Sequence, residues 1–133
     1  MPTPPSDVLI GDRELEVLHE LWRRGPSTVA EVQERLRDDL AYTTVLTILR
    51  NLEAKGFVAH EAVGRAHRYA AVIPAKAVHE LALTRLLRNV FRGDAIALVA
   101  SLVQRRALSS AQLRELAEAI DAKRGGASRR RRK

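Results

Sequence analysis

Residues 28–55 of the chain, TVAEVQERLRDDLAYTTVLTILRNLEAK, predict two helices separated by a short turn. Thr28 and Glu31 have the spacing of a capping box, in which a hydroxyl and a carboxylate each bind a backbone amide at a helix start. The segment 37–40 is the expected turn, and a further helix is expected from Tyr42 to Lys55, ended by Gly56. This order of helix, turn and helix decides the fold class.

The helix expected at 42–55 has an unusual outer face. Its apolar residues follow helical spacing and form one stripe, which consists of Val45, Ile48, Leu49 and Leu52. The opposite face carries Thr43, Thr47, Arg50 and Ala54, with Asn51 beside them. A solvated helix face normally mixes Glu and Lys, so small hydroxyls with a single arginine indicate contact with a ligand.

The flanking sequence supplies the remaining elements of a known arrangement. A first helix is expected from Asp12 to Arg24, capped by Gly11 or Asp12 and stopped by Gly25-Pro26. Two strands, about Phe57–Ala62 and Arg65–Ala71, are expected to form a hairpin through Val63-Gly64. Three helices followed by a hairpin predict a mainly α chain that begins with a winged helix-turn-helix, whose third helix enters the DNA major groove.

A surface that enters the major groove needs short side chains near the backbone and a few long donors that reach base edges. The first turn of the third helix offers hydroxyls and free amides to phosphate, and an arginine further along can pair with guanine. The predicted DNA-binding residues are Tyr42, Thr43, Thr44, Thr47, Arg50, Asn51, Arg65 and Arg68. The alternative is that Thr43 is only a helix cap and Arg50 only a solvated residue.

Composition divides the chain into four expected parts. They are a frayed lead-in at 1–9, the winged helix at 10–72, a helical domain at 73–123 and a basic, disordered tail at 124–133. The formal charge is −2 over residues 1–72, +2 over 73–122 and +7 over 123–133. The basic total therefore reflects the tail, which either adds non-specific DNA affinity by counterion release or only solubilises the terminus.

The region after Pro74 is expected to hold helices at about 75–92, 94–105 and 109–123, the last opened by a capping box at Ser109 and Gln112. These helices are too few and too apolar to form a stable domain alone, so a core shared with a second copy of the chain is expected. The predicted dimerisation residues are Leu81, Leu87, Val90, Phe91, Val99, Leu102, Leu113, Leu116 and Ile120. The alternative is a helical subdomain that packs within one chain.

Several classes of protein are excluded by what the sequence lacks. The chain of 133 residues has no cysteine, which excludes disulfides, cysteine metal sites and thiol catalysis and fits a reducing, cytoplasmic setting. No apolar run is long enough to span a bilayer, and residues 1–7 do not have the pattern of a signal peptide. No cofactor is expected, and no nucleophile triad, phosphate loop or carboxylate pair predicts an enzyme.

The expected hairpin carries two histidines, His60 and His67. A two-residue turn at Val63-Gly64 would place His60 directly opposite His67. Such a pair is either half of a metal site or two wing residues near phosphate or solvent, and the second interpretation is favoured because no third ligand is predicted nearby.

The motifs together resemble one family. ELEVL at 14–18 with Leu21-Trp22, AYTTV at 41–45 and GRAHRY at 64–69 are similar to the BlaI/MecI/CopY family of penicillinase-type repressors. The resemblance is close over residues 10–72 and looser, by helix pattern, over 73–122. It implies a homodimeric repressor with an N-terminal winged helix, which binds double-stranded palindromic operators, in relatives often of a TACA/TGTA type.

The resemblance also implies two inducing mechanisms that this sequence does not carry intact. In the beta-lactamase branch, a membrane metalloprotease sensor triggers cleavage of an Asn-Phe bond, which would fall near Ser101-Leu102 here; this sequence lacks that pair. In the copper branch, metal is sensed by a C-terminal cysteine cluster, which is absent here. Two other functions stay open: an effector-binding regulator with a pocket between the C-terminal helices, and a helical protein-interaction module.

Overall fold

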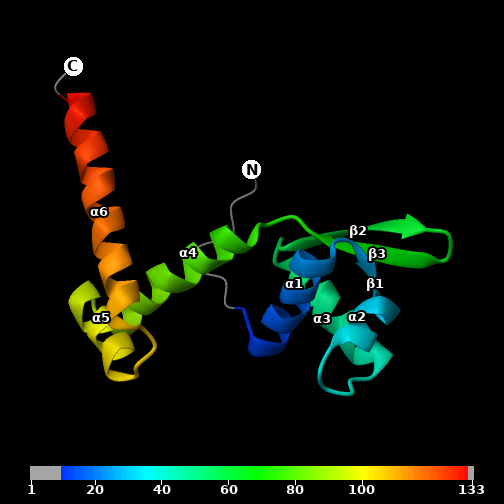
Figure 1. Cartoon of the computed structure of the whole chain (residues 1–133). Coiled ribbons are helices and arrows are strands. Elements are labelled where there is room, and N and C mark those ends of the chain that lie inside the picture. The colour runs from blue at the N-terminus through cyan, green and yellow to red at the C-terminus, as the bar shows by residue number, and fades with distance from the viewer. Residues whose placement is uncertain (1–9, 132–133) are drawn as a thin grey trace. The chain divides into compact units, whose positions relative to one another are not determined.

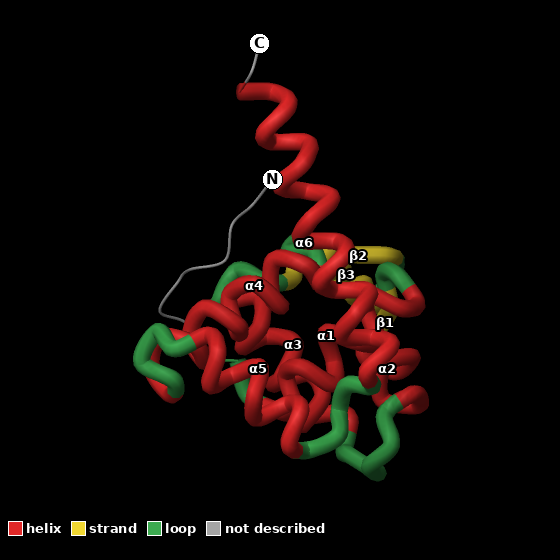
Figure 2. Tube along the Cα trace, turned by 60° about the vertical axis from the view of Figure 1, so that its left-hand side comes forward, coloured by secondary structure: helices red, strands yellow, loops and turns green. Residues whose placement is uncertain are grey.

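The computed structural model describes the backbone of residues 10–131 and the side chains of residues 10–124. In chain order the elements are α1 (Asp12–Arg24), β1 (Ser27–Thr28), α2 (Val29–Arg35), α3 (Tyr42–Ala54), β2 (Val58–Val63), β3 (Ala66–Ala71), α4 (Ala75–Arg85), the π-helix η1 (Leu86–Val90), α5 (Ala95–Gln104) and α6 (Ser110–Arg131) (Figure 1). Most of the chain is helical, with one small sheet (Figure 2). It forms two compact units, one up to Thr84 and one from Arg85 on.

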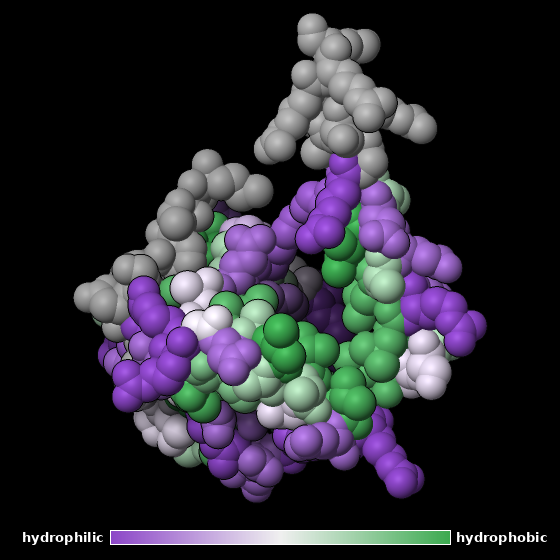
Figure 3. All heavy atoms as spheres, turned by 90° about the vertical axis from the view of Figure 1, so that its left-hand side faces the viewer, coloured by the Kyte–Doolittle hydropathy of each residue, from purple (hydrophilic) through white to green (hydrophobic). Residues whose placement is uncertain are grey.

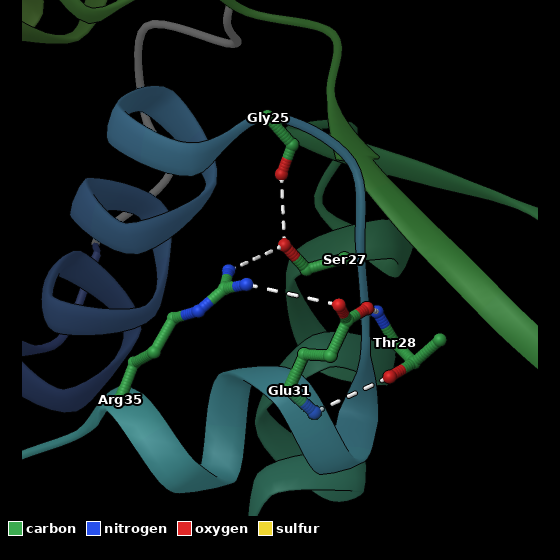
Figure 4. A network of polar contacts seen from close by, with 5 residues as sticks. All are labelled: Gly25, Ser27, Thr28, Glu31 and Arg35. Carbon is green, nitrogen blue, oxygen red and sulfur yellow. Dashed lines mark hydrogen bonds and ion pairs between the residues drawn. The ribbon is translucent and has the colours of Figure 1, made fainter.

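The first two helices begin as predicted. Gly11 caps α1, and its amide donates a 2.9 Å hydrogen bond to Oε1 of Glu14. Thr28 caps α2: its amide donates to Oε1 of Glu31 at 2.9 Å, and the amide of Glu31 donates to Oγ1 of Thr28 at 3.2 Å (Figure 4). The predicted capping box is thus confirmed.

A third strand, β1, joins the hairpin in the antiparallel order β1-β3-β2. Ser27 pairs with Tyr69 and Thr28 with Arg68. The hydroxyl of the buried Ser27 donates to the carbonyl oxygen of Gly25 and accepts from Nη1 of Arg35, both at 2.9 Å (Figure 4). The two predicted strands are confirmed as β2 and β3. The third strand, β1, was not predicted, because a strand of two residues is too short to show an alternating pattern.

The hairpin turn lies one residue later than predicted. Val63 pairs with Ala66, so Gly64 and Arg65 form the turn instead of Val63 and Gly64. Gly64 has a φ of 63°, as the first central residue of a type II′ turn requires. With this register His60 opposes Tyr69 and His67 opposes Ala62, so the predicted direct pairing of the two histidines is wrong.

One hydrophobic core holds the first unit together. Its buried residues come from α1, α2, α3, β2 and β3 and extend to the first turns of α4: Val17, Leu18, Leu21, Val29, Val32, Val45, Ile48, Leu49, Leu52, Phe57, Val58, Tyr69, Ile73 and Val78. Nζ of Lys55, at the end of α3, lies 2.7 Å from Oε1 of Glu14 on α1. The core and this ion pair fix α3 against the other helices.

The second unit differs from its prediction in two places. The helix expected at 75–92 is an α-helix only to Arg85 and continues as the π-helix η1, in which the amide of Phe91 donates to the carbonyl oxygen of Leu86 at 3.1 Å. Helix α6 continues to Arg131, whereas the sequence predicts a helix end at Lys123 and a disordered tail. Each glycine of a helix interior costs only about 1 kcal/mol relative to alanine, so Gly125 and Gly126 do not force an end.

The remaining helix starts of this unit follow their sequence signals. The side chain of Asp94 caps α5 by accepting from the amide of Ala97 at 3.0 Å. At α6, the amide of Ser109 donates to Oε1 of Gln112 at 2.8 Å, and the amide of Gln112 donates to Oγ of Ser109 at 3.1 Å, which confirms the second capping box. Within residues 10–131, no helix is long and apolar enough to cross a membrane.

The expected lead-in at residues 1–9 and the last two tail residues, 132 and 133, lie outside the described residues.

Candidate nucleic-acid interface

Helix α3 separates its apolar and polar residues as the sequence predicts. Val45, Ile48, Leu49 and Leu52 are buried in the core. The six residues of this helix that were predicted to bind DNA are all exposed: Tyr42, Thr43, Thr44, Thr47, Arg50 and Asn51. The structure thus leaves these six residues available for a ligand, while their binding to DNA stays a prediction.

The start of α3 is not capped by a threonine side chain. Ala41 is the N-cap residue, and its carbonyl oxygen accepts from the amides of Thr44 at 3.0 Å and Val45 at 3.1 Å. Thr43 is therefore a residue of the first turn, and the alternative that it serves only as a helix cap is wrong. The hydroxyl of Thr47 donates to the carbonyl oxygen of Thr43 at 2.9 Å, which fixes its rotamer.

Side chains of α1 and α2 fix the turn between α2 and α3. Nε2 of Gln33 donates to the carbonyl oxygen of Leu40 at 2.9 Å, and Arg13 on α1 forms an ion pair with Asp38. These contacts hold α3 at a set angle to α2, which a helix-turn-helix requires.

The two arginines of the hairpin have different surroundings. Arg65 is exposed at the turn, but Arg68 is half-buried on β3, directly opposite Glu61 on β2 and Thr28 on β1. The hydrogen bonds with Thr28 are the main cause that lowers the pKa of Glu31, and the positive charges of Arg35 and Arg68 lower it further. Of the two hairpin arginines, Arg65 is the more accessible.

A polar junction, which the sequence did not reveal, links α3 to the hairpin. Nδ1 of His60 lies 2.7 Å from Oε2 of Glu53, and the amide of His60 donates to the same oxygen at 3.2 Å. The ring of His60 stacks on that of His67 with centroids 4.6 Å apart and planes inclined by 22°. Stacked rings do not aim their nitrogens at one point, and the described residues hold no group of three or more potential metal ligands.

The phenol of Tyr69 lies beside this junction, with its ring centroid 5.2 Å from that of His60. Burial is the main cause that raises the pKa of Tyr69, the carboxylate of Glu53 raises it further, and Arg50 opposes both. Tyr69 therefore stays a neutral phenol near pH 7.

The second unit exposes most of its apolar side chains. Among residues 85–124, none is fully buried, and the exposed large apolar residues are Leu86, Val90, Ile96, Val99, Leu102, Val103, Leu116 and Ile120. The most exposed of these side chains is Ile96, with 82% of its surface accessible. Figure 3 shows apolar side chains gathered on the face that carries the C-terminal helices.

Five of the residues predicted for dimerisation are exposed: Val90, Val99, Leu102, Leu116 and Ile120. Leu87, Phe91 and Leu113 are half-buried. Leu81 instead packs against the core of the first unit.

Two cavities bear on the alternative of an effector-binding regulator. One of about 620 Å³ is an apolar depression lined by residues of α5 alone, from Ala95 to Gln104. Another of about 800 Å³ is lined by residues of α1, α2 and α4 and the segment after α2, among them Trp22, His79 and Arg37. Neither lies between the C-terminal helices, where that alternative places its pocket.

Comparison with known proteins gives one matching family and a structural likeness. The family model described as penicillinase repressor matches residues 10–122. Two relatives named transcriptional regulator BlaI, from the Mycobacterium tuberculosis strains CDC 1551 / Oshkosh and ATCC 25618 / H37Rv, are 50% identical over 66 residues, which is 47% of this chain and 48% of each relative. The match thus spans about half the length of these curated relatives.

A solved structure supports the fold. The transcriptional regulator Tm0710 from Thermotoga maritima is 20% identical, with a TM-score of 0.51 over 93% of this chain and 80% of that chain. This likeness concerns the fold alone, and it agrees with the winged helix-turn-helix predicted from the sequence.

Proposed function

The chain belongs to the penicillinase repressor family, and on this premise we propose that it is a sequence-specific, dimeric DNA-binding repressor of transcription. Helix α3 enters the major groove, and the hairpin of β2 and β3 lies against the flanking backbone or minor groove. Binding overlaps the site of the polymerase, so repression is steric, and weakening of the dimer releases the promoter.

The composition of the exposed face of α3 is the single observation that carries the proposal. Short hydroxyl side chains at Thr43 and Thr47 allow the helix backbone to come close to base edges, where a threonine methyl can touch thymine. Arg50 and Asn51 supply donors and acceptors long enough to read a base pair. The net charge of −2 over residues 1–72 does not oppose this, because phosphate contacts act within a Debye length of about 8 Å.

The exposed apolar residues of the second unit support a homodimer. Helices with no buried side chain between residues 85 and 124 gain little stability alone, and a second copy can cover them. A twofold dimer presents two copies of α3 to DNA, which predicts a palindromic operator with half-sites one helical turn or more apart.

A membrane metalloprotease is the partner that the family resemblance adds. The bond cleaved in relatives would fall near Ser101-Leu102, within α5, and this chain has no Asn-Phe pair there. A protease of this kind would have to accept a different bond, so the proposal does not depend on it. The proposal places the protein in the cytoplasm, where its DNA lies, and assigns it no enzymatic activity.

A gel-shift experiment with the full chain tests the proposal. The probe is the DNA upstream of the chain's own gene, and the variant combines Thr47→Glu with Arg50→Glu. The control combines Ala111→Glu with Arg114→Glu, which makes the same change in charge at exposed residues of α6. We expect the wild-type and control chains to bind and the α3 variant to fail.

Two results would contradict the proposal in different ways. If the α3 variant binds as well as the control, α3 is not the DNA-reading helix. If the folded wild-type chain binds neither this DNA nor any sequence selected from a random library, the function is wrong, and the alternative of a protein-interaction module is preferred.

A further inference from the structure

The outer part of the hairpin extends beyond the hydrophobic core. Val58 is the last buried residue of β2, and every later residue of that strand is exposed. On β3, Ala66 and His67 are exposed as well. Strand β1 pairs only with Tyr69 and its neighbour Arg68, so the turn that carries Arg65 lies at the end of a ribbon of two strands. Because such a ribbon is only marginally stable by itself, its direction depends on contacts with neighbouring elements.

Glu53, in the last turn of α3, supplies a contact of this kind. Its Oε1 and Oε2 lie 2.8 Å and 2.7 Å from Nδ1 of His60, which follows Val58 by two residues on β2. Oε2 also accepts a hydrogen bond from the amide of His60 at 3.2 Å. A carboxylate only accepts hydrogen bonds, so Nδ1 carries the proton and donates it. Glu53 therefore holds both the main chain and the side chain of His60.

The ring of His60 extends this restraint to the second strand. It stacks on the ring of His67 with centroids 4.6 Å apart and planes inclined by 22°. His60 opposes Tyr69 in the sheet, so His67 is its diagonal neighbour on the same face of the hairpin. His67 in turn follows Arg65 by two residues. A continuous row of side chains thus runs from the end of α3 across both strands to the base of the turn.

We propose that His60 is a positioning residue: through Glu53 and His67 it fixes the wing, which consists of β2, β3 and their turn, relative to α3. Arg65 is then presented to a phosphate of the DNA backbone at a set place relative to the major-groove contacts of α3. Since the two contacts are held in one arrangement before DNA arrives, the second costs little freedom once the first has formed. The inference rests on the proposed DNA-binding function.

A double-mutant cycle with the full chain tests this role. Wild type, His60→Phe, Arg65→Ala and the double variant are measured against a site that the wild-type chain selects from a random DNA library. His60→Phe keeps an aromatic ring for the stack with His67 and removes the donor to Glu53. We expect Arg65→Ala to weaken binding about tenfold in the wild-type background and about threefold or less in the His60→Phe background, because an unrestrained wing places Arg65 less often against DNA.

Two further variants separate positioning from other effects of the replacement. His67→Phe makes the same change in the other ring of the stack and leaves the contact between Glu53 and His60 in place, so Arg65→Ala should keep its tenfold effect there. His60→Asn places an amide donor near the position of Nδ1 and should restore most of the coupling. Circular dichroism establishes that each variant is folded at the assay temperature. Equal effects of Arg65→Ala with and without His60→Phe, or no effect in the wild-type background, would overturn the inference.

A second measurement does not require DNA. The chain has no cysteine, so Glu34→Cys on α2 and Ala66→Cys on β3, both at exposed positions, accept spin labels at defined places. Labelled chains are mixed with an excess of unlabelled chains, so that distances within one chain dominate. We expect a narrow distance distribution with His60 or His60→Asn and a clearly broader one with His60→Phe.

The two measurements distinguish the inference from the function on which it rests. A distance distribution that His60→Phe leaves unchanged overturns the inference even if DNA binding is confirmed. A wild-type chain that selects no sequence refutes the proposed function instead, and the spin labels still decide whether His60 fixes the wing.

Discussion

Nε1 of Trp22 donates a 2.9 Å hydrogen bond to the carbonyl oxygen of Ile73, 51 positions later in the chain. The indole thereby joins the C-terminal part of α1 to the segment that leads from the sheet into α4. His19 and His79 lie edge-on to it, with ring centroids at 5.3 Å and 6.4 Å.

Replacement of this indole should destabilise the first unit. We expect Trp22→Phe to lower the free energy of unfolding by about 2 kcal/mol. The carbonyl of Ile73 loses its hydrogen-bond donor, and the smaller phenyl ring leaves part of the indole's space unfilled. Urea unfolding followed by circular dichroism measures this, since the variant removes the only tryptophan. The exposed His19→Ala should cost about 0.5 kcal/mol or less, and an equal loss in both variants would contradict the prediction.

The phenol of Tyr69 should ionise above the ordinary tyrosine pKa of 10. The chain has two tyrosines, so in Tyr42→Phe the tyrosinate absorbance at about 295 nm reports on Tyr69 alone. Because the pKa is raised in the folded state, this phenol contributes stability that is fully present below pH 10 and is lost as the pH rises through the raised pKa. The urea midpoint of wild type should therefore fall more steeply above pH 10 than that of Tyr69→Phe, and parallel curves would contradict the prediction.

The capping box of α2 should be worth a measurable amount. Thr28→Ala removes the acceptor of the amide of Glu31 and should cost about 1 kcal/mol, whereas Thr28→Ser keeps the hydroxyl and should cost much less. The pKa of Glu31 is lowered by hydrogen bonds with Thr28, so its contribution is present above the ordinary carboxylate pKa and is lost as the pH falls through the lowered value. Urea unfolding at pH 7 and at acidic pH measures both effects, and a difference between wild type and Glu31→Gln that persists unchanged at low pH would contradict the second.

Self-association should depend on the apolar side chains of α5. Sedimentation of the full chain should show a dimer, and Val99→Asp combined with Val103→Asp should give a monomer with unchanged helical content, because charges replace two exposed apolar contacts. Ala111→Asp, at an exposed residue of the first turn of α6, should leave the dimer intact. A wild-type monomer would contradict the proposed dimer, and a double variant that stays dimeric would place the interface elsewhere.

Most of the structure of the first unit was predicted from the helical spacing of its apolar residues. The spacing of Val45, Ile48, Leu49 and Leu52 determines which face of α3 is buried, and the opposite face follows from geometry alone. Capping residues located the helix starts because each acts within three or four positions. Features that depend on a few neighbouring residues were therefore predicted well.

Features that depend on pairing between distant residues were not. The contact of Glu53 with His60 needs the end of α3, the turn after it and the strand register to be known together. An error of one residue in the turn changed the partner of His60 from His67 to Tyr69. No signal distinguishes η1 from an α-helix, because its residues are ordinary helix formers and only the hydrogen-bond pattern differs.

The π-helix has a consequence for how this chain can vary. A π turn holds about one residue more than an α turn of the helix around it. Loss of a single codon within residues 86–90, at the exposed Arg88 or Asn89, would therefore be absorbed by a return to regular winding, and Phe91 would keep its direction. The same deletion inside α5 would instead rotate every later residue of that helix by about 100°, so η1 is the place in this region where a change of length disturbs the fold least.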